Sequence, residues 1–148
     1  MYLLNCRSRL ALACCAFIST LAFGQTPTVL RDLDAQGRVT LSKDELSQLM
    51  PSAKIGRLNA KGEEQLWSND PGGNLVVSSD NRNSGGRRTT AQGKWHLSDD
   101  GRYCVLIEWR SVGAEEWCRY ILKAGPDYYA ANSDKSGTER VYRLQISK

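Results

Sequence analysis

The sequence YCVLIEWRSVGAEEWCRYIL, residues 103–122, contains two runs in which apolar side chains recur at alternate positions. The runs cover residues 103–109 and 117–122, and a short polar bend separates them. Successive side chains of a strand point to opposite faces, so this pattern predicts a β-hairpin. Cys104 lies in the first run and Cys118 in the second, so we expect a disulfide bond that joins the two strands.

This disulfide sets a register for the hairpin. If Cys104 lies directly opposite Cys118, Val105 pairs with Trp117. By the two-residue period of a strand, Arg119 then shares a face with these two apolar residues. A buried arginine without a partner is costly, so Arg119 needs either a carboxylate or a bound ligand. The candidate carboxylates are Glu108, Glu115 and Glu116.

The first 24 residues have the pattern of a cleavable secretory signal. Arg7 and Arg9 precede an apolar run over residues 10–23, and small residues occupy the positions one and three before Gln25. The apolar run is too short to anchor the chain across a bilayer. We therefore predict a signal peptide over residues 1–24, a periplasmic or secreted protein, and no transmembrane segment after cleavage.

Three of the five cysteines, Cys6, Cys14 and Cys15, lie in this signal, which leaves Cys104 and Cys118 in the exported chain. A single disulfide suits an oxidising compartment. Acylation of Cys14 or Cys15, as in a lipoprotein, is the weaker alternative because too little apolar sequence precedes these cysteines.

Cleavage after Gly24 would leave 124 of the 148 residues, which is enough for one domain with its own core but not for two. Removal of Arg7 and Arg9 lowers the formal net charge from +4 to about +2. A nucleic-acid-binding protein would carry a basic face, whereas Arg87 and Arg88 form the only adjacent basic pair. We therefore expect no nucleic-acid partner.

Residues 25–40 are polar and mixed in charge, and they predict a flexible arm ahead of a single β-rich domain over residues 41–148. Ser42, followed three residues later by Glu45, forms a capping box, the reciprocal pairing that starts a helix. A proline ends this helix, which we expect over residues 43–50.

From residue 53 onward, clusters of turn-forming residues recur at short intervals and predict an antiparallel meander of about eight strands. We expect these strands near residues 54–58, 64–68, 74–79, 88–97, 102–110, 116–123, 127–132 and 138–147. The predicted fold class is mainly β, with one short N-terminal helix and then a meander that forms a small lipocalin-like barrel or a sandwich. Closure into a barrel would remove exposed strand edges, but the pattern does not choose between the two.

His96 is the only histidine, so histidine-dependent catalysis must use it. A hydrolase that pairs His96 with Asp99 or Asp100 is one alternative function, but no motif identifies an orienting partner, and we predict no catalytic residue. The sequence Ser98-Asp99-Asp100-Gly101 favours a tight hairpin turn over a calcium loop. Two cysteines and one histidine are too few ligands for a zinc site, so we expect no metal and no cofactor.

The exported chain has four tryptophans and five tyrosines but no phenylalanine. Tryptophan and tyrosine suit a site that is apolar at one end and wet at the other, although large rings also fill the core of a small barrel. If the rings form a ligand-binding site, we expect Trp95, Trp109, Trp117 and Arg119 to line it.

Several short motifs together resemble a known group of proteins. They are Gly93-Lys94-Trp95, Asp100-Gly101-Arg102-Tyr103-Cys104, Trp117-Cys118-Arg119, Tyr129, and Leu41-Ser42 with Glu45-Leu46. In these motifs the chain resembles small exported proteobacterial domains of unknown function, which share G-x-W, D-G-x-x-C and W-C-R. The resemblance covers residues 41–147 and implies a periplasmic or secreted β-rich domain with a Cys104–Cys118 bridge, but no reaction. Gly93 and Gly101 of this pattern are expected to permit turns.

These observations favour a non-enzymatic binding module for a small ligand or an envelope protein. The alternatives are the His96 hydrolase and a structural or inhibitory envelope protein whose loop over residues 78–90 contacts a partner. A cavity lined by Trp95 and Arg119 would favour the ligand-binding module, whereas His96 paired with a carboxylate in a cleft would favour the hydrolase.

Overall fold

The computed structural model describes residues 28–59, 62–81, 85–110 and 113–148, so the predicted signal peptide lies outside the described residues. Within these ranges the chain forms two short helices and nine strands. In chain order they are the 3-10 helix η1 (Leu30–Gln36), β1 (Val39–Thr40), α1 (Lys43–Leu49), β2 (Lys54–Leu58), β3 (Glu64–Asn69), β4 (Asn74–Ser79), β5 (Thr89–Leu97), β6 (Tyr103–Trp109), β7 (Gly113–Ala124), β8 (Asp127–Ala131) and β9 (Tyr142–Ser147).

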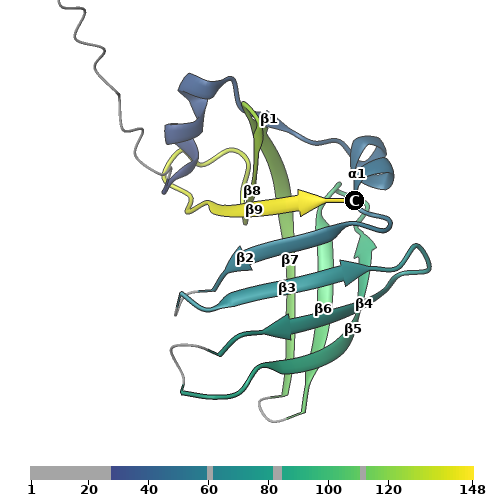
Figure 1. The fold of residues 1–148 in the computed structure, drawn as a ribbon. Coiled ribbons are helices and arrows are strands. Elements are labelled where there is room, and N and C mark those ends of the chain that lie inside the picture. Colours follow the sequence, from purple (N-terminus) through teal and green to yellow (C-terminus); the bar gives the residue numbers. More distant parts are fainter. Residues whose placement is uncertain (1–27, 60–61, 82–84, 111–112) are drawn as a thin grey trace, which may run out of the picture.

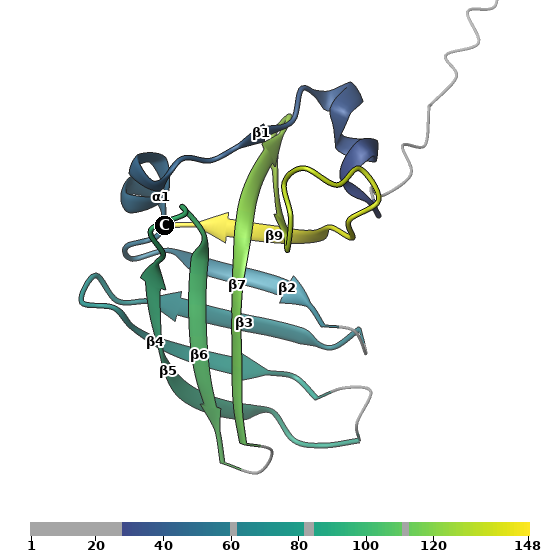
Figure 2. The same ribbon diagram turned by 180° about the vertical axis from the view of Figure 1, so that it is seen from behind.

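Strands β2 to β9 form a closed antiparallel barrel (Figure 1). Each of these strands pairs with the next along the chain, and β9 pairs back with β2. The extra strand β1 pairs with the upper end of β7 (Figure 2). The prediction of a mainly β meander is confirmed, and the closed pairing selects the barrel over the sandwich.

The hairpin of β6 and β7 has the predicted register. Cys104 lies opposite Cys118, the two form a disulfide, and Val105 pairs with Trp117. Tyr103 and Val105 are buried inside the barrel, as their shared face requires. The alternation of side chains along residues 103–122 therefore predicted both the partner strands and the face that each residue occupies.

Helix α1 covers one end of the barrel. The Ser42 backbone N–H donates to Glu45 Oε2 at 2.8 Å, and the Glu45 N–H donates to Ser42 Oγ at 3.3 Å, which confirms the capping box. Leu46 and Met50 are fully buried in the core of the barrel. An isolated helix of this length is unstable in water, so this burial holds α1 in place.

The N-terminal arm is packed against the barrel over residues 28–40. The prediction of a flexible arm over residues 25–40 is therefore wrong for this described part. Leu30 and Leu33, three positions apart on η1, are fully buried in a second apolar cluster with Leu122 and Tyr129. The arm also contributes β1 to the edge of β7. Two leucines among charged residues gave too weak a period to be recognised as a helix face from the sequence.

Gly93 corrects a second expectation, because it lies inside β5, opposite Ile107, and not in a turn. A Cβ atom added to Gly93 would lie 2.1 Å from the Leu106 carbonyl oxygen, so glycine is required by close approach of the backbones. Gly101 does permit a turn, with φ of 77° between β5 and β6.

A chain of hydrogen bonds runs through the interior of the barrel at the end that α1 covers. Trp67 Nε1 donates to Tyr103 Oη at 3.0 Å, and Tyr103 Oη donates to Asn69 Oδ1 at 2.9 Å. Asn69 Nδ2 donates in turn to the Met50 carbonyl oxygen at 3.0 Å. Burial raises the pKa of the Tyr103 phenol well above its ordinary value. The phenol therefore stays protonated, accepts the hydrogen bond from Trp67 and donates the one to Asn69.

The Tyr103→Phe variant is expected to unfold with a free energy lower by about 2 kcal/mol. The substitution leaves the buried Trp67 N–H without its acceptor and Asn69 Oδ1 without its donor. Urea denaturation measures the loss, and Tyr120→Phe serves as control because Tyr120 is only half-buried. Equal stability of the two variants would contradict the assigned network.

Candidate ligand-binding site

The interior of the barrel has an apolar half near α1 and a polar half at the opposite end. Cross-strand pairing places Arg57 beside Gln65 on neighbouring strands, with both side chains inward. On β7, Glu115 and Arg119 share the inward face of Trp117 by the two-residue period. Four polar side chains from three strands therefore meet inside the barrel.

This polar half opens to the outside because the wall of the barrel is incomplete there. β7 pairs with β6 over residues 113–119, but its pairing with β8 begins only at Tyr120. β9 likewise pairs with β2 only as far as Gly56. A hollow of about 350 Å³ lies between the two incomplete edges. Its lining residues are Arg57, Leu58, Asn59, Gln65, Glu115, Trp117, Arg119 and Tyr142.

Arg57 is held on one side of the hollow by an ion pair. Its Nη2 donates to Glu115 Oε1 at 2.7 Å and its Nε donates to Gln65 Oε1 at 2.9 Å. The Arg57 side chain is 14% exposed and the Glu115 side chain 34%. Trp109 Nε1 donates to the other Glu115 oxygen at 3.2 Å, and the guanidinium carbon of Arg57 lies 5.0 Å from the Trp117 ring centre. Glu115 therefore neutralises Arg57.

Arg119 has no such counter-ion among the described residues. Its Nη1 donates to Asn132 Oδ1, and Asn132 Nδ2 donates onward to Glu139 Oε1 at 2.8 Å. Burial lowers the pKa of the Arg119 guanidinium, and the nearby Arg57 cation acts in the same direction, whereas Tyr142, Glu139 and Glu115 oppose them. Of the predicted carboxylate partners, Glu115 pairs with Arg57. Arg119 thus keeps its positive charge available to the hollow.

Trp117 forms the aromatic wall between the two arginines. Its ring packs edge-on against Trp67 and Tyr103 at centroid distances of 6.1 and 6.0 Å. The guanidinium carbon of Arg119 lies 5.8 Å from its centre. The buried Trp117 Nε1 has no hydrogen-bond partner in the part of the chain that the structure describes. The Trp117 ring lines the hollow, whereas this N–H is buried.

Two of the four residues predicted to line a site, Trp117 and Arg119, line the hollow. Trp109 does not line it, although its Nε1 donates to Glu115, which does. Trp95 lies elsewhere: its Nε1 donates to the Asp70 carbonyl oxygen at 2.8 Å, and its ring contacts Tyr103 in the apolar half.

Five lining residues of the hollow were not predicted from the sequence: Arg57, Leu58, Asn59, Gln65 and Tyr142. Arg57 lies two positions after the buried Ile55, and Gln65 lies two positions before the buried Trp67. Alternation along these short strands therefore indicated inward polar side chains, but nothing local indicated that they would meet β7.

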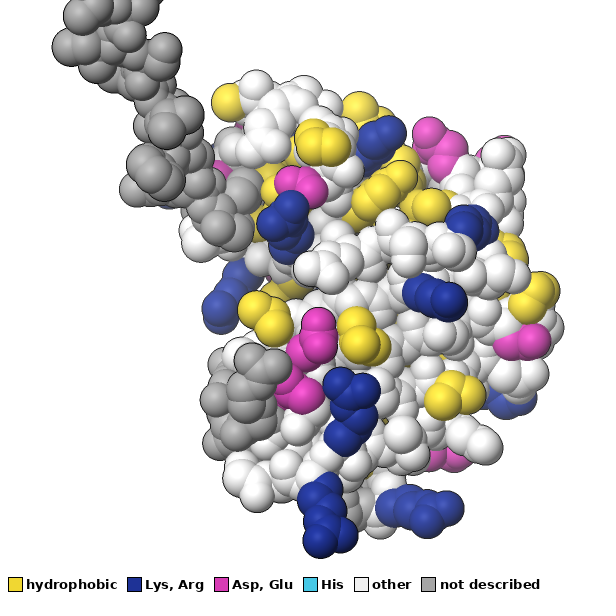
Figure 3. All heavy atoms as spheres, viewed as in Figure 1, with side chains coloured by type: hydrophobic (Ala, Val, Ile, Leu, Met, Phe, Trp, Pro, Cys, Tyr) yellow, Lys and Arg dark blue, Asp and Glu magenta, His cyan; other side chains and the backbone are white. Residues whose placement is uncertain are grey.

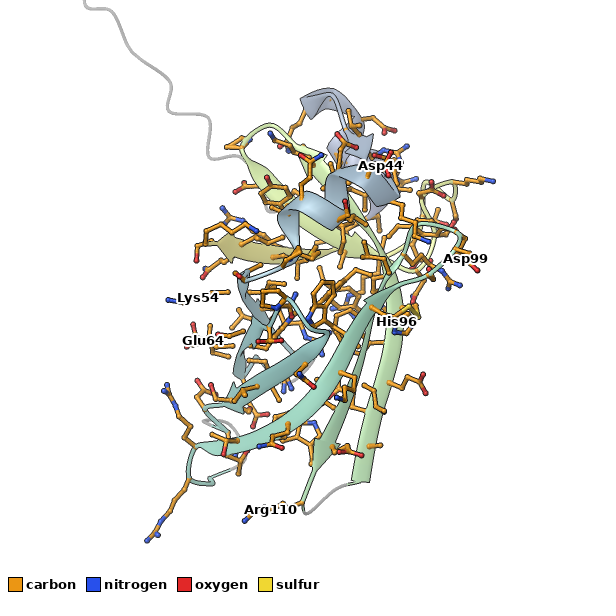
Figure 4. All side chains as sticks on the ribbon, turned by 90° about the vertical axis from the view of Figure 1, so that its right-hand side faces the viewer. Asp44, Lys54, Glu64, His96, Asp99 and Arg110 are labelled. Atoms are coloured by element: carbon orange, nitrogen blue, oxygen red, sulfur yellow. A yellow bond between two sulfur atoms is a disulfide. The ribbon has the colours of Figure 1, made fainter. Side chains whose placement is uncertain are left out.

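His96 lies on the outer face of β5, opposite Cys104, and is exposed. Figure 4 labels His96 on the strand and Asp99 in the turn that follows it. Asp99 pairs with Lys43 at 3.2 Å, and Asp100 pairs with Arg102 at 2.8 Å. Neither carboxylate is within hydrogen-bond distance of His96, and the predicted tight turn at these residues is confirmed by the Gly101 N–H, which donates to the Ser98 carbonyl oxygen.

Three other hollows, of about 380, 570 and 450 Å³, lie on the described part of the barrel, and none of them is lined by Arg119. On the face shown in Figure 3, basic and acidic side chains are interspersed with isolated hydrophobic ones. No group of three His, Cys, Asp or Glu side chains in the described ranges is placed to hold a metal ion. Across the same residues, the helices are too short and too polar to traverse a bilayer.

Comparison of the chain with protein-family models, with curated proteins and with solved structures gives no match in any of the three. The resemblance to small exported proteobacterial domains therefore stays a prediction.

Proposed function

We propose that this protein is an exported, non-enzymatic binding domain and that the side opening of its barrel binds a small ligand with an anionic group. Arg119 carries the proposal. A partly buried guanidinium is costly without a negative partner, and its present hydrogen bond is to a neutral amide. A carboxylate or phosphate in the hollow would supply the missing charge and accept two hydrogen bonds.

The other walls of the hollow favour a ligand that also has a flat or apolar part. Trp117 offers an aromatic surface, and Leu58 adds an exposed aliphatic side chain. The volume of about 350 Å³ is near the lower end of the range for ligand pockets. These dimensions suit a compact ligand, with its charge at Arg119 and its apolar part against Trp117.

Export is supported by two independent features of the chain. The first 24 residues have the pattern of a secretory signal, and Cys104 and Cys118 form a disulfide. Such bonds persist in oxidising compartments such as the periplasm and the space outside the cell.

The Arg119→Gln variant is expected to bind carboxylates at least tenfold more weakly than the unmodified protein. A charge-assisted hydrogen bond contributes about 1.5 to 3 kcal/mol, and about 1.4 kcal/mol corresponds to tenfold in affinity. Benzoate and indole acetate are suitable test ligands, with the matching uncharged amides as comparison. Titrations followed by the NMR signal of the Trp117 indole N–H would measure the affinity.

Arg88→Gln is the matched control, because Arg88 is an exposed arginine that lines neither this hollow nor the one beside it. It should leave carboxylate binding unchanged. Equal affinity for the acids and their amides, or equal affinity of the Arg119 and Arg88 variants, would contradict an anion site at Arg119.

A further inference from the structure

The lower half of β7 presents an unpaired strand edge to the hollow. β8 pairs with one edge of β7 over residues 120–124. β1 pairs with residues 122 and 123 of β7 and must therefore lie on the opposite edge, which is the edge that β6 pairs with over residues 113–119. The Leu41 N–H donates to the Ile121 carbonyl oxygen at 2.8 Å, so Ile121 directs its backbone groups toward β1. Backbone direction alternates along an antiparallel strand. Even-numbered residues of β7 therefore direct their N–H and C=O groups toward β8 over residues 120–124 and toward the hollow over residues 114–118.

Three residues direct their backbone groups to this open edge: Ala114, Glu116 and Cys118. No hydrogen bond in the described part of the chain reaches their N–H or C=O groups. Natural sheets usually cover or pair such an edge, because it is a template for another strand. Here β6 and the Cys104–Cys118 disulfide hold the opposite side of the strand in place. The edge is therefore ordered before any partner arrives, which lowers the entropic cost of pairing.

We propose that the ligand of this opening is an extended peptide segment of a partner protein, which adds a strand to the free edge of β7 and directs an acidic side chain inward. This inference rests on the proposed function and specifies its ligand. Main-chain hydrogen bonds to an exposed edge supply affinity, and alternate side chains supply specificity. Inward side chains of an added strand would lie about 5 Å from their neighbours on β7, within reach of Trp117 and Arg119.

The charges on β7 predict the side-chain pattern of this peptide. An inward acidic side chain would meet Arg119, whose charge has no carboxylate partner among the described residues. Outward side chains of the same peptide would face Glu116, which is exposed on the outer surface. The preferred segment therefore alternates acidic or apolar inward residues with basic outward residues. A second copy of this chain fits less well, because antiparallel pairing of two β7 edges over residues 114–118 would place two Glu116 carboxylates directly opposite each other.

Amide hydrogen exchange measured by NMR tests the added strand. The test ligand is a peptide blocked at both ends, with the sequence TVKEKVT, in which glutamate and valines share one face and lysines the other. We expect exchange of the Glu116 and Cys118 amides to slow at least tenfold when the peptide is bound. The Trp117 amide points to β6 and should change little.

Two comparisons separate the contributions of charge and pairing. The peptide TVKQKVT should bind at least tenfold more weakly, and Arg119→Gln should reduce the preference for glutamate over glutamine. A peptide methylated on alternate backbone nitrogens of the pairing edge should not protect Glu116 or Cys118. Equal protection by the methylated peptide would overturn the added strand.

The outcomes also distinguish failure of this inference from failure of the proposed function. If benzoate binds at Arg119 but TVKEKVT leaves the Glu116 and Cys118 amides unprotected, the anion site stands and the added strand is wrong. If neither benzoate nor the peptide binds, both proposals are wrong. Protection that increases with protein concentration alone would identify a second copy as the occupant and would also overturn the peptide.

Discussion

Replacement of both Cys104 and Cys118 with alanine is expected to lower the free energy of unfolding by about 2 to 5 kcal/mol. The disulfide joins residues 14 positions apart, and closure of a loop of about 15 residues restricts the unfolded chain by about 3 kcal/mol in the chain-entropy model. A cross-strand side-chain pair, such as Val105 with Trp117, contributes only about 0.2 to 1 kcal/mol. The bond is therefore the largest single contribution to the hairpin.

Urea denaturation of the variant and of the oxidised protein measures this difference. Unmodified protein treated with a reductant is the matched control, since it breaks the same bond without changing the side-chain volume. The double-alanine variant and the reduced protein should show similar decreases in the free energy of unfolding. A loss below about 0.5 kcal/mol, the size of a surface substitution, would show that packing alone holds β6 against β7. Free thiols in protein recovered from its natural compartment would instead contradict the prediction of export.

The parts of the fold that follow local rules could be predicted from the sequence. Alternation along residues 103–122 gave the hairpin, its register and its buried face, because one face of the strand must be apolar. The pairing of Ser42 with Glu45 gave the start of α1, because it satisfies orphan N–H groups within one turn.

Features that depend on distant contacts were missed or left open. Leu30 and Leu33 are buried only because β7 and β8 provide the second apolar cluster. Closure of the barrel depends on pairing of β9 with β2, residues about ninety positions apart, which no local pattern specifies.

The same distinction applies to the candidate site. Trp117 and Arg119 were predicted together because both lie on one face of one strand. Arg57 joins them through its ion pair with Glu115, which is 58 positions away in the sequence. The assignment of Glu115 to Arg57 leaves Arg119 without a carboxylate, and only the closed barrel reveals this choice. A sequence pattern could predict that Arg119 needs a partner, but not that Glu115 would pair with Arg57.

The Gly93→Ala variant is expected to lose about 3 kcal/mol of unfolding free energy or more, at the upper end of the range for overpacked cores. The added Cβ would lie 2.1 Å from the Leu106 carbonyl oxygen and 3.1 Å from Leu75 Cδ1. The carbonyl belongs to the backbone of β6, so relief of the overlap requires the strands to separate and weakens their ladder of hydrogen bonds.

Gly56→Ala is the matched control, because Gly56 is also a glycine inside a strand with no positive φ. A Cβ there would meet only side chains, with Leu66 Cδ2 at 3.0 Å and Gln145 Oε1 at 3.5 Å, and these can move. Alanine also lowers the conformational entropy of the unfolded chain. This effect stabilises the fold by about 0.4 to 1 kcal/mol and offsets part of the cost of the new contacts. We therefore expect less than about 1 kcal/mol of change at Gly56. Equal losses at both glycines, measured by urea denaturation, would show that loss of the small residue, and not the backbone approach at Leu106, determines stability.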